Sequence, residues 1–174
     1  MTTSSAKPSP ATKSRFAPGD FVIYPGHGLG KVACIERQTV GTHEVEVLVI
    51  TFEKDRMTLR VPLQKVATSG LRGLSTQQVM DKALTTLKGR ASGRRGMWSR
   101  RAIEYAAKIK SGDPGIIAEV VRDLHRGEGQ PDQSYSERLI YEQALDRLTR
   151  EVAAIEKIEL EAATTKVEQL LKAA

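Results

Sequence analysis

The residues best suited to chemistry lie in one short segment, Arg94–Arg101, where the only tryptophan of the chain stands between two pairs of arginines. Arginine side chains and the backbone amides at a helix N-terminus both bind phosphate groups. A large apolar side chain among such groups is typical of minor-groove insertion, which partly unstacks a base step. A lone tryptophan is more often a core residue than a functional one, but this one has Gly96, Met97 and Ser99 as neighbours at a predicted loop–helix junction. The residues alone therefore support two roles for Trp98 equally, a DNA wedge and a packing residue.

The positive charge of the chain is concentrated around the same segment. The chain has 174 residues and a formal net charge of +6. The charge is +3 over residues 1–15, zero over 16–70, +8 over 71–112 and −5 over 113–174. A basic block beside an acidic one favours a polyanionic partner for that block over general stickiness. The structural alternative is a solvated helix face.

The glycine-rich segment Gly26–Lys31 does not match a nucleotide-binding motif. A phosphate-binding loop of the Walker type needs glycine at position 25 and serine or threonine at position 32, where this chain has Pro25 and Val32. The dinucleotide fingerprint fails as well, because its third glycine position holds Lys31. We therefore expect a turn between two strands.

No candidate catalytic or metal-binding set is visible either. Cys34 lies in an apolar predicted strand, so we expect it to be buried rather than reactive. The three histidines, His27, His43 and His125, have no further ligands at the short spacings that tetrahedral zinc requires. The sequence predicts no metal, no cofactor and no enzymatic activity.

A small β module is predicted between residues 16 and 70. Valine, isoleucine, threonine and phenylalanine are enriched there, and turn residues recur between the apolar runs. Five short strands of this kind match an antiparallel barrel of the SH3 or Tudor type, which usually serves as a binding module. The predicted strands are Phe21–Tyr24, Lys31–Gln38, Val45–Phe52, Met57–Val61 and Val66–Thr68.

A compact all-helical domain of about five helices is predicted over residues 71–174, where the hydrophobic period becomes helical. The fold class is therefore α+β with two domains, and the boundary falls near Ser69–Gly70. Expected N-terminal signals are Ser75 with Gln78, Ser99, Asp113 before Pro114, and Ser134 with Glu137. Gly89 is expected to end the first helix, and a last helix is expected over residues 162–171. The apolar faces of the first four are expected to be Val79, Met80, Ala83, Leu84 and Leu87; Ile103, Ala106, Ala107 and Ile109; Ile117, Val120, Val121 and Leu124; and Leu139, Leu145, Leu148, Val152 and Ile155.

The two ends of the chain carry their own expectations. Residues 1–15 are rich in serine, threonine, proline and lysine, so we expect a disordered tail. That segment has no apolar stretch of the secretory type, and no run approaches the ~20 apolar residues that span a bilayer. We expect a soluble protein with no membrane partner. The last residues, Leu170–Ala174, resemble C-terminal signals read by bacterial energy-dependent proteases, but alanine-rich helix ends are common, and the sequence favours a fraying helix end.

Taken in order and spacing, several motifs resemble the CarD/CdnL family of bacterial transcription regulators. The resemblance covers roughly residues 16–172. The matching motifs are Pro18–Gly28, Leu59–Pro62, Trp98–Arg101, Ser111–Asp113 and Ala118–Leu124.

The resemblance implies a Tudor-like domain that docks on the β subunit of RNA polymerase. Arg60, in the Leu-Arg-Val-Pro motif with Val61 and Pro62, matches the main polymerase contact of the family. A second family contact falls near Arg37 and Gln38, at one of these two positions.

The resemblance also implies a helical domain that contacts promoter DNA. In the family, the tryptophan of the Trp-Ser-Arg-Arg motif inserts into the minor groove at the upstream edge of the transcription bubble, so Trp98 is the implied wedge. Arg100 and Arg101 are the implied backbone contacts, and Arg138 is a further one. Ile103 stands where some relatives have a basic residue. Arg94, Arg95 or Lys108 is therefore expected to make part of the contacts with the DNA phosphate backbone.

The resulting hypothesis is a non-catalytic, cytoplasmic, nucleoid-associated regulator that stabilises promoter open complexes and is monomeric when bound to polymerase. The main alternative is a protein-interaction adaptor with a Tudor-like module and no DNA role, in which Trp98 belongs to the core. A third hypothesis is RNA binding through the basic segment.

Overall fold

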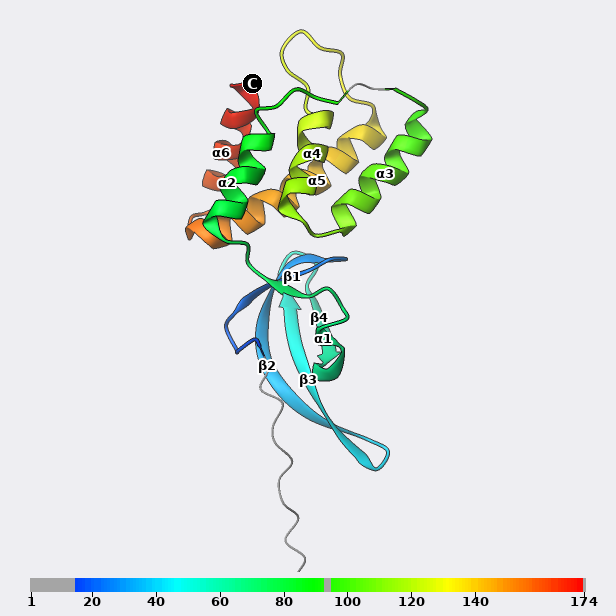
Figure 1. The fold of residues 1–174 in the computed structure, drawn as a ribbon, viewed down its shortest axis with the longest axis vertical. Coiled ribbons are helices and arrows are strands. Elements are labelled where there is room, and N and C mark those ends of the chain that lie inside the picture. Colours follow the sequence, from blue (N-terminus) through cyan, green and yellow to red (C-terminus); the bar gives the residue numbers. More distant parts are fainter. Residues whose placement is uncertain (1–14, 93–94, 174) are drawn as a thin grey trace, which may run out of the picture.

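The computed structural model describes residues 15–92 and 95–173, and the predicted N-terminal tail lies outside them except for Arg15. Within this part, the chain forms an antiparallel five-stranded sheet followed by a helical domain stacked on one end of it (Figure 1). The predicted α+β class, with a Tudor-like N-terminal module, is confirmed. The strands are β1 (Phe21–Tyr24), β2 (Gly28–Val40), β3 (His43–Phe52), β4 (Met57–Pro62) and β5 (Arg72–Gly73), in the order β4-β3-β2-β1-β5.

The predicted fifth strand at Val66–Thr68 is wrong. A short helix, α1 (Leu63–Val66), begins just before this segment and includes Val66. The fifth strand is β5, which pairs antiparallel with β1: Val22 lies opposite Gly73, and Ile23 lies opposite Arg72. The helix forms because Leu63 and Val66, three residues apart, both pack against the core of the sheet. Tertiary packing thus overrides the β propensity of the valine.

Gly30 lets β2 cross closely over the core of the sheet. A Cβ atom at this position would lie 2.7 Å from Ile50 Cγ2 and 2.8 Å from Phe52 Cε1. We expect Gly30→Ala to lower the free energy of unfolding by about 1–3 kcal/mol, the usual cost of overpacking. Denaturant unfolding measures this, with Gly127→Ala as the control, because a Cβ there meets nothing within 4 Å. Equal unfolding midpoints for the two variants would contradict the prediction.

Five helices follow the sheet, as predicted, and they enclose a second core. They are α2 (Gln77–Thr86), α3 (Trp98–Lys110), α4 (Pro114–Leu124), α5 (Tyr135–Glu156) and α6 (Leu160–Lys172). The fully buried centre of this core includes Met80, Val120 and Leu148. The sheet has a separate core around Leu48, Ile50 and Phe52. Each domain therefore buries its own apolar residues.

Two of the four predicted helix starts are confirmed, and two are wrong. Asp113 caps α4, with Pro114 as its first residue, and Ser134 forms a capping box with Glu137 at α5. At α2 the cap is Thr76 rather than Ser75, because the hydroxyl and amide of Ser75 are bonded to Arg72 and Glu151. Helix α3 begins at Trp98, one residue before Ser99, and has no side-chain cap.

The predicted apolar face of α4 is confirmed, that of α3 is largely wrong, and those of α2 and α5 each include one exposed residue. Val79 on α2 and Leu139 on α5 are exposed. On α3, Ile103 is 73% exposed, and Ala106 and Ala107 are exposed as well. On α3, Tyr105 takes the buried position instead, together with Ile109. Cys34 is only half-buried, and α2 ends at Thr86, before Gly89. The side of α3 that meets the helical core carries Tyr105 and Ile109, four residues apart, and not the predicted residues before Ile109.

Candidate nucleic-acid and partner surfaces

Trp98 is the first residue of α3, at the end of the helical domain far from the sheet (Figure 1). Its indole is half-buried and packs against the helical core. The indole Nε1–H donates a hydrogen bond of 2.8 Å to Ser136 Oγ at the start of α5. The preceding residue, Met97, is 75% exposed. Trp98 is therefore neither a fully buried core residue nor a free side chain, but an anchored and partly exposed one.

Arg101 is held beside Trp98 by two aromatic rings. Its guanidinium carbon lies 5.6 Å from the centre of the Trp98 ring and 5.6 Å from that of Tyr105. The guanidinium also donates to the Tyr105 hydroxyl at 3.2 Å. Cation–π contacts of this kind pre-orient an arginine while leaving most of its N–H groups available. The arrangement joins one cation to the indole at the start of α3.

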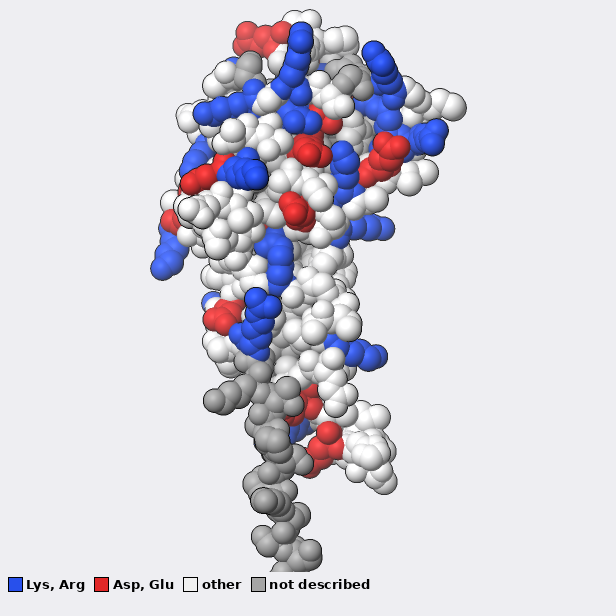
Figure 2. All heavy atoms as spheres, viewed as in Figure 1, with Lys and Arg blue, Asp and Glu red and all other residues white. Residues whose placement is uncertain are grey.

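The other predicted DNA-contact residues divide into two groups. Arg95, Arg100 and Arg138 are exposed, and Arg138 lies two residues beyond Ser136 on α5. Lys108, in contrast, lies ten residues along α3 from Trp98 and pairs with Glu119 at 3.3 Å, about 15 Å away along the helix axis. Arg94 lies outside the described residues. Figure 2 shows lysine and arginine side chains gathered over the helical end of the molecule.

The predicted polymerase-contact residues lie in the sheet domain. Arg60 on β4 pairs with Glu36 at 3.5 Å, and Arg37 on β2 pairs with Glu46 at 3.4 Å, both at exposed positions. Gln38 is exposed next to Arg37. Val61 is only 6% exposed and belongs to the core of the sheet, so only its backbone faces the surroundings. Pro62 is half-buried and precedes α1.

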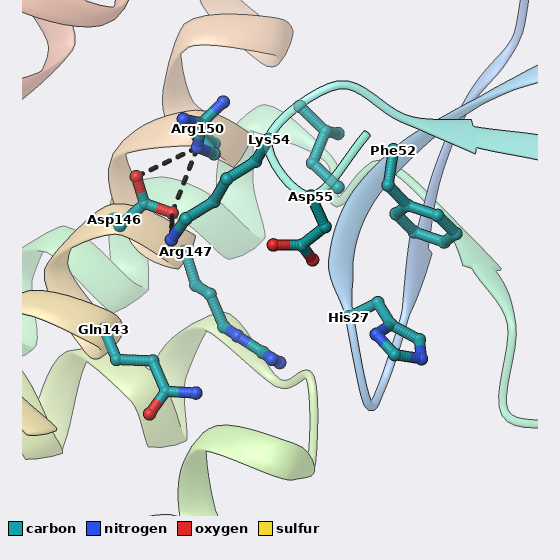
Figure 3. Close-up of a pocket in the computed structure, with 9 residues that line it drawn as sticks. His27, Phe52, Lys54, Asp55, Gln143, Asp146, Arg147 and Arg150 are labelled. Atoms are coloured by element: carbon teal, nitrogen blue, oxygen red, sulfur yellow. Dashed lines mark hydrogen bonds and ion pairs between the residues drawn. The ribbon is translucent and has the colours of Figure 1, made fainter. Parts of the chain in front are cut away.

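The two domains are joined by polar contacts that converge on α5. Arg147 donates to the Pro25 and Gly26 carbonyls at 2.9 and 2.8 Å, and Lys54 pairs with Asp146 at 2.6 Å. The side chains of Arg147, Asp146 and Lys54 line a cleft of about 100 Å³ between the domains. His27 and Phe52 lie on its sheet side (Figure 3). Burial lowers the pKa of Arg147, and the carboxylates of Asp55 and Asp146 oppose this shift. The guanidinium nevertheless stays charged at neutral pH.

A second polar junction lies beside the first. The guanidinium of Arg72 on β5 meets the carboxylate of Glu151 in two parallel bonds of 2.8 and 3.0 Å. The same guanidinium donates to the Gly112 carbonyl, just after α3, at 2.5 Å. The side chain of Glu151 is only 3% exposed. A buried carboxylate must be paired and hydrogen-bonded, and the two parallel bonds fix the orientation of Arg72 relative to Glu151.

Two further titratable groups have shifted pKa values away from these surfaces. Burial lowers the pKa of His125, opposed by Glu168, and burial together with Glu168 raises the pKa of Tyr141 to about 12. The His125 Nδ1 and Tyr141 hydroxyl lie 3.3 Å apart. Both groups are therefore neutral near pH 7, and they form a local contact between the end of α4 and α5.

Within residues 15–92 and 95–173, no group of three or more histidine, cysteine or acidic residues is placed to hold a metal ion. Across the same ranges, no helix combines the length and apolar character needed to cross a membrane.

The fold and these surfaces define a two-domain protein in which polar contacts join a small β module to a helical domain that carries a basic segment. Two family models match it: "CarD-like/TRCF RID domain" over residues 16–75 and "CarD, C-terminal domain" over residues 82–168. The chain belongs to the CarD family and is a CarD-like transcription regulator.

Two relatives accompany these matches. The "Putative transcription factor YdeB" of Bacillus subtilis (strain 168) is 29% identical over 143 residues, which are 82% of this chain and 94% of that protein. A solved structure, the solution NMR structure of the 72-residue N-terminal domain of Myxococcus xanthus CarD, is 28% identical. That similarity covers 40% of this chain and 92% of the other, with a TM-score of 0.30.

Sequence reasoning missed the residues that hold the candidate site in place. Tyr105 was detectable, because it lies four residues after Arg101 and seven after Trp98, on one helix face. Ser136 was not, because it is 38 residues from Trp98 in the chain. Arg72, Arg147 and Glu151 gave no signal either, since their partners lie in the other domain.

Proposed function

We propose that the protein docks on the β subunit of RNA polymerase through its sheet domain and stabilises the promoter open complex through its helical domain. Trp98 is the wedge, and it enters the minor groove at the upstream edge of the bubble. The observation that carries the proposal is the position of Trp98 itself: a half-buried indole at an exposed helix start, beside Arg101 and near Arg100 and Arg138. The regulator acts in the cytoplasm, at the nucleoid, as a monomer on polymerase.

Energetics support insertion of this indole. To stack on a base step, the indole gives up its hydrogen bond to Ser136 and part of its packing. A typical net hydrogen bond contributes about 1 kcal/mol, whereas stacking of a base on an aromatic ring contributes about 1–3 kcal/mol. The exchange is therefore favourable where bases are already unstacked, as at a fork. It is less favourable on closed duplex, and only such a difference shifts the equilibrium.

Arg95, Arg100, Arg101 and Arg138 supply the phosphate contacts in this proposal, with Arg94 as a further candidate. Phosphate contacts position a protein on DNA without reading its sequence. A wedge in the minor groove reads shape and A·T content, so we propose a general regulator rather than an operator-specific one. Lys108 is a weaker candidate, because Glu119 already neutralises it.

The sheet domain acts as the tether. β4 forms one edge of the sheet, so one side of its backbone is available to a partner strand or loop. Arg60 stands on this strand, and Arg37 and Gln38 stand on the same sheet. Docking of this domain raises the effective concentration of the helical domain at the promoter, so neither contact needs to be strong alone.

The lifetime of open complexes tests the proposal directly. We expect complexes of RNA polymerase on a promoter to survive a competitor challenge at least severalfold longer when the protein is present. The measurement is the decay of heparin-resistant complexes, or of a fluorescent reporter in the bubble. An unchanged lifetime at a saturating protein concentration would contradict the proposal.

The packing of Trp98 against the helical core favours the adaptor as a second candidate. In that case Trp98 only stabilises the helical domain, and the sheet domain binds a protein partner without DNA. The adaptor predicts that the protein neither binds fork DNA nor changes the lifetime of open complexes.

A further inference from the structure

The end of α3 next to the sheet is clamped by two arginines. Figure 1 shows α3 with its first turn far from the sheet and its last turn beside it. The helix begins at Trp98 and ends at Lys110. Arg147 of α5 donates to the Pro25 and Gly26 carbonyls of the β1–β2 turn and, at 3.4 Å, to the Ile109 carbonyl in the last turn of α3. One guanidinium thus joins the sheet domain, α5 and the Trp98 helix.

Arg72 makes the corresponding connection from the sheet side. It belongs to β5, and it donates to the Gly112 carbonyl at 2.5 Å while it binds both oxygens of Glu151 on α5. Gly112 has a φ of +72°, and a Cβ atom there would lie 3.5 Å from Pro25 Cα. The chain leaves α3 in direct contact with the sheet domain, so the sheet, α3 and α5 are fixed against one another at this point.

The length of α3 links the contacts at its clamped end to the position of Trp98 at its other end. The helix has 13 residues, about 20 Å at 1.5 Å per residue. A change in its direction at the clamped end moves the other end in proportion to this length. At that other end, Ser136 of α5 holds the indole. α5 therefore contacts both the sheet domain and the tryptophan.

We propose that Arg72 and Arg147 are positioning residues, which hold the sheet domain and α3 at one angle so that a single docked geometry presents Trp98 to the fork. The inference rests on the proposed function for its consequence, but its structural part stands independently. A rigid connection keeps the effective concentration of the wedge high, whereas a loose one spreads the wedge over positions where it contacts nothing.

Arg147→Ala is the test variant, and Arg150→Ala is its matched control. Both remove one arginine from the same stretch of α5. Among the contacts of the described residues, Arg150 bonds only to Asp146, one turn earlier on its own helix. Its removal leaves the Lys54–Asp146 ion pair between the domains in place. Arg147 bonds to carbonyls of the sheet domain and of α3. Circular dichroism and thermal unfolding show which variants remain folded, and Arg147→Lys serves as a second, milder variant if the alanine variant does not.

The first measurement is the distance between spin labels on the two domains, by pulsed electron resonance. The labels replace Thr42, in the exposed β2–β3 turn, and the exposed Ile103 of α3, with Cys34 replaced by serine. We expect one narrow distribution for the otherwise wild-type protein and for Arg150→Ala, and a broad one for Arg147→Ala. A broad distribution without the Arg147 change, or a narrow one with it, would overturn the clamp.

The second measurement is functional. We expect Arg147→Ala to reduce the lengthening of open-complex lifetime at least fivefold. Its affinity for polymerase and the affinity of the free protein for fork DNA should each change less than twofold. If Arg147 only stabilised the fold, Arg147→Ala would lower the lifetime effect, the affinity for polymerase and the affinity for fork DNA together. A full lifetime effect despite a broad distance distribution would also overturn the inference. If wild-type protein does not change the lifetime at all, the proposed function fails, and the distance measurement still decides on the clamp.

Discussion

Trp98→Ala is expected to shorten the lifetime of promoter open complexes to nearly that measured without the protein, while polymerase binding stays intact. Stacking of an aromatic ring on a base contributes about 1–3 kcal/mol. Because about 1.4 kcal/mol corresponds to a tenfold change in an equilibrium constant, the loss lies between about fivefold and a hundredfold. The measurement is the decay of open complexes after a competitor challenge, at protein concentrations that saturate polymerase.

Two further substitutions separate the wedge from its anchor. Trp98→Phe keeps an aromatic ring but loses the Nε1–H that donates to Ser136, so it should retain much of the effect. Ser136→Ala keeps the indole and removes the acceptor. We expect the lifetime with Ser136→Ala to be at least as long as with wild-type protein, because the indole then leaves its resting position more easily.

The single tryptophan also serves as its own probe. Stacking on bases should quench its fluorescence when the protein binds fork DNA, and the quenching should be absent with closed duplex. An unchanged open-complex lifetime with a folded Trp98→Ala protein would remove the wedge. Loss of folding in this variant, together with no quenching on DNA, would support the adaptor instead.

Arg60→Glu is expected to abolish co-purification with RNA polymerase. Arg60 is an exposed cation on the edge strand, and its ion pair with Glu36, at 3.5 Å, is partly solvated. In the proposed docking, the partner buries Arg60, and truncating one member of a charge pair that an interface buries costs about 2–5 kcal/mol. Reversing the sign of the charge adds repulsion. The expected loss of affinity is therefore at least about thirtyfold. Circular dichroism should show an intact fold, because Arg60 contributes nothing to the core of the sheet.

Further charge and side-chain variants locate the polymerase-binding surface around Arg60. Lys110→Glu makes the same change of charge at the exposed end of α3 and should leave polymerase binding unchanged. Arg37→Glu and Gln38→Ala test the second contact, and a partial loss is expected from whichever residue forms it. If Arg60→Glu retained full binding, docking would have to use another face of the sheet domain.

Much of the fold follows from local sequence signals. The alternating and continuous apolar runs predict four of the five strands. They do so because successive side chains of a strand point to opposite faces of the sheet, which leaves a repeat of two residues in the sequence. Asp113–Pro114 and the Ser134–Glu137 capping box predict the starts of α4 and α5, because both satisfy orphan amides within a few residues. These signals succeed because the partners are neighbours in the chain.

The errors have a common physical origin in longer-range contacts. Val66 belongs to a helix because it packs against the sheet core, and the true fifth strand has only two residues, Arg72 and Gly73. Ser75 carries a good capping pattern, but Glu151, 76 residues away, binds its amide. A residue committed to a distant partner cannot serve the local role that its neighbours predict.

The basic segment and its single tryptophan were evident from the sequence alone, because the segregation of charge and the Trp-Ser-Arg-Arg motif are properties of neighbouring residues. The sequence did not show whether Trp98 is a DNA wedge or a core residue. That distinction depends on Ser136 and Tyr105, which give Trp98 an anchored and half-exposed position. Only the tertiary structure also shows that Arg72 and Arg147 bind the Trp98 helix to the sheet domain. Hydrogen bonds between chain segments tens of residues apart leave no periodic pattern, so the geometry that links the two surfaces exists only in the folded molecule.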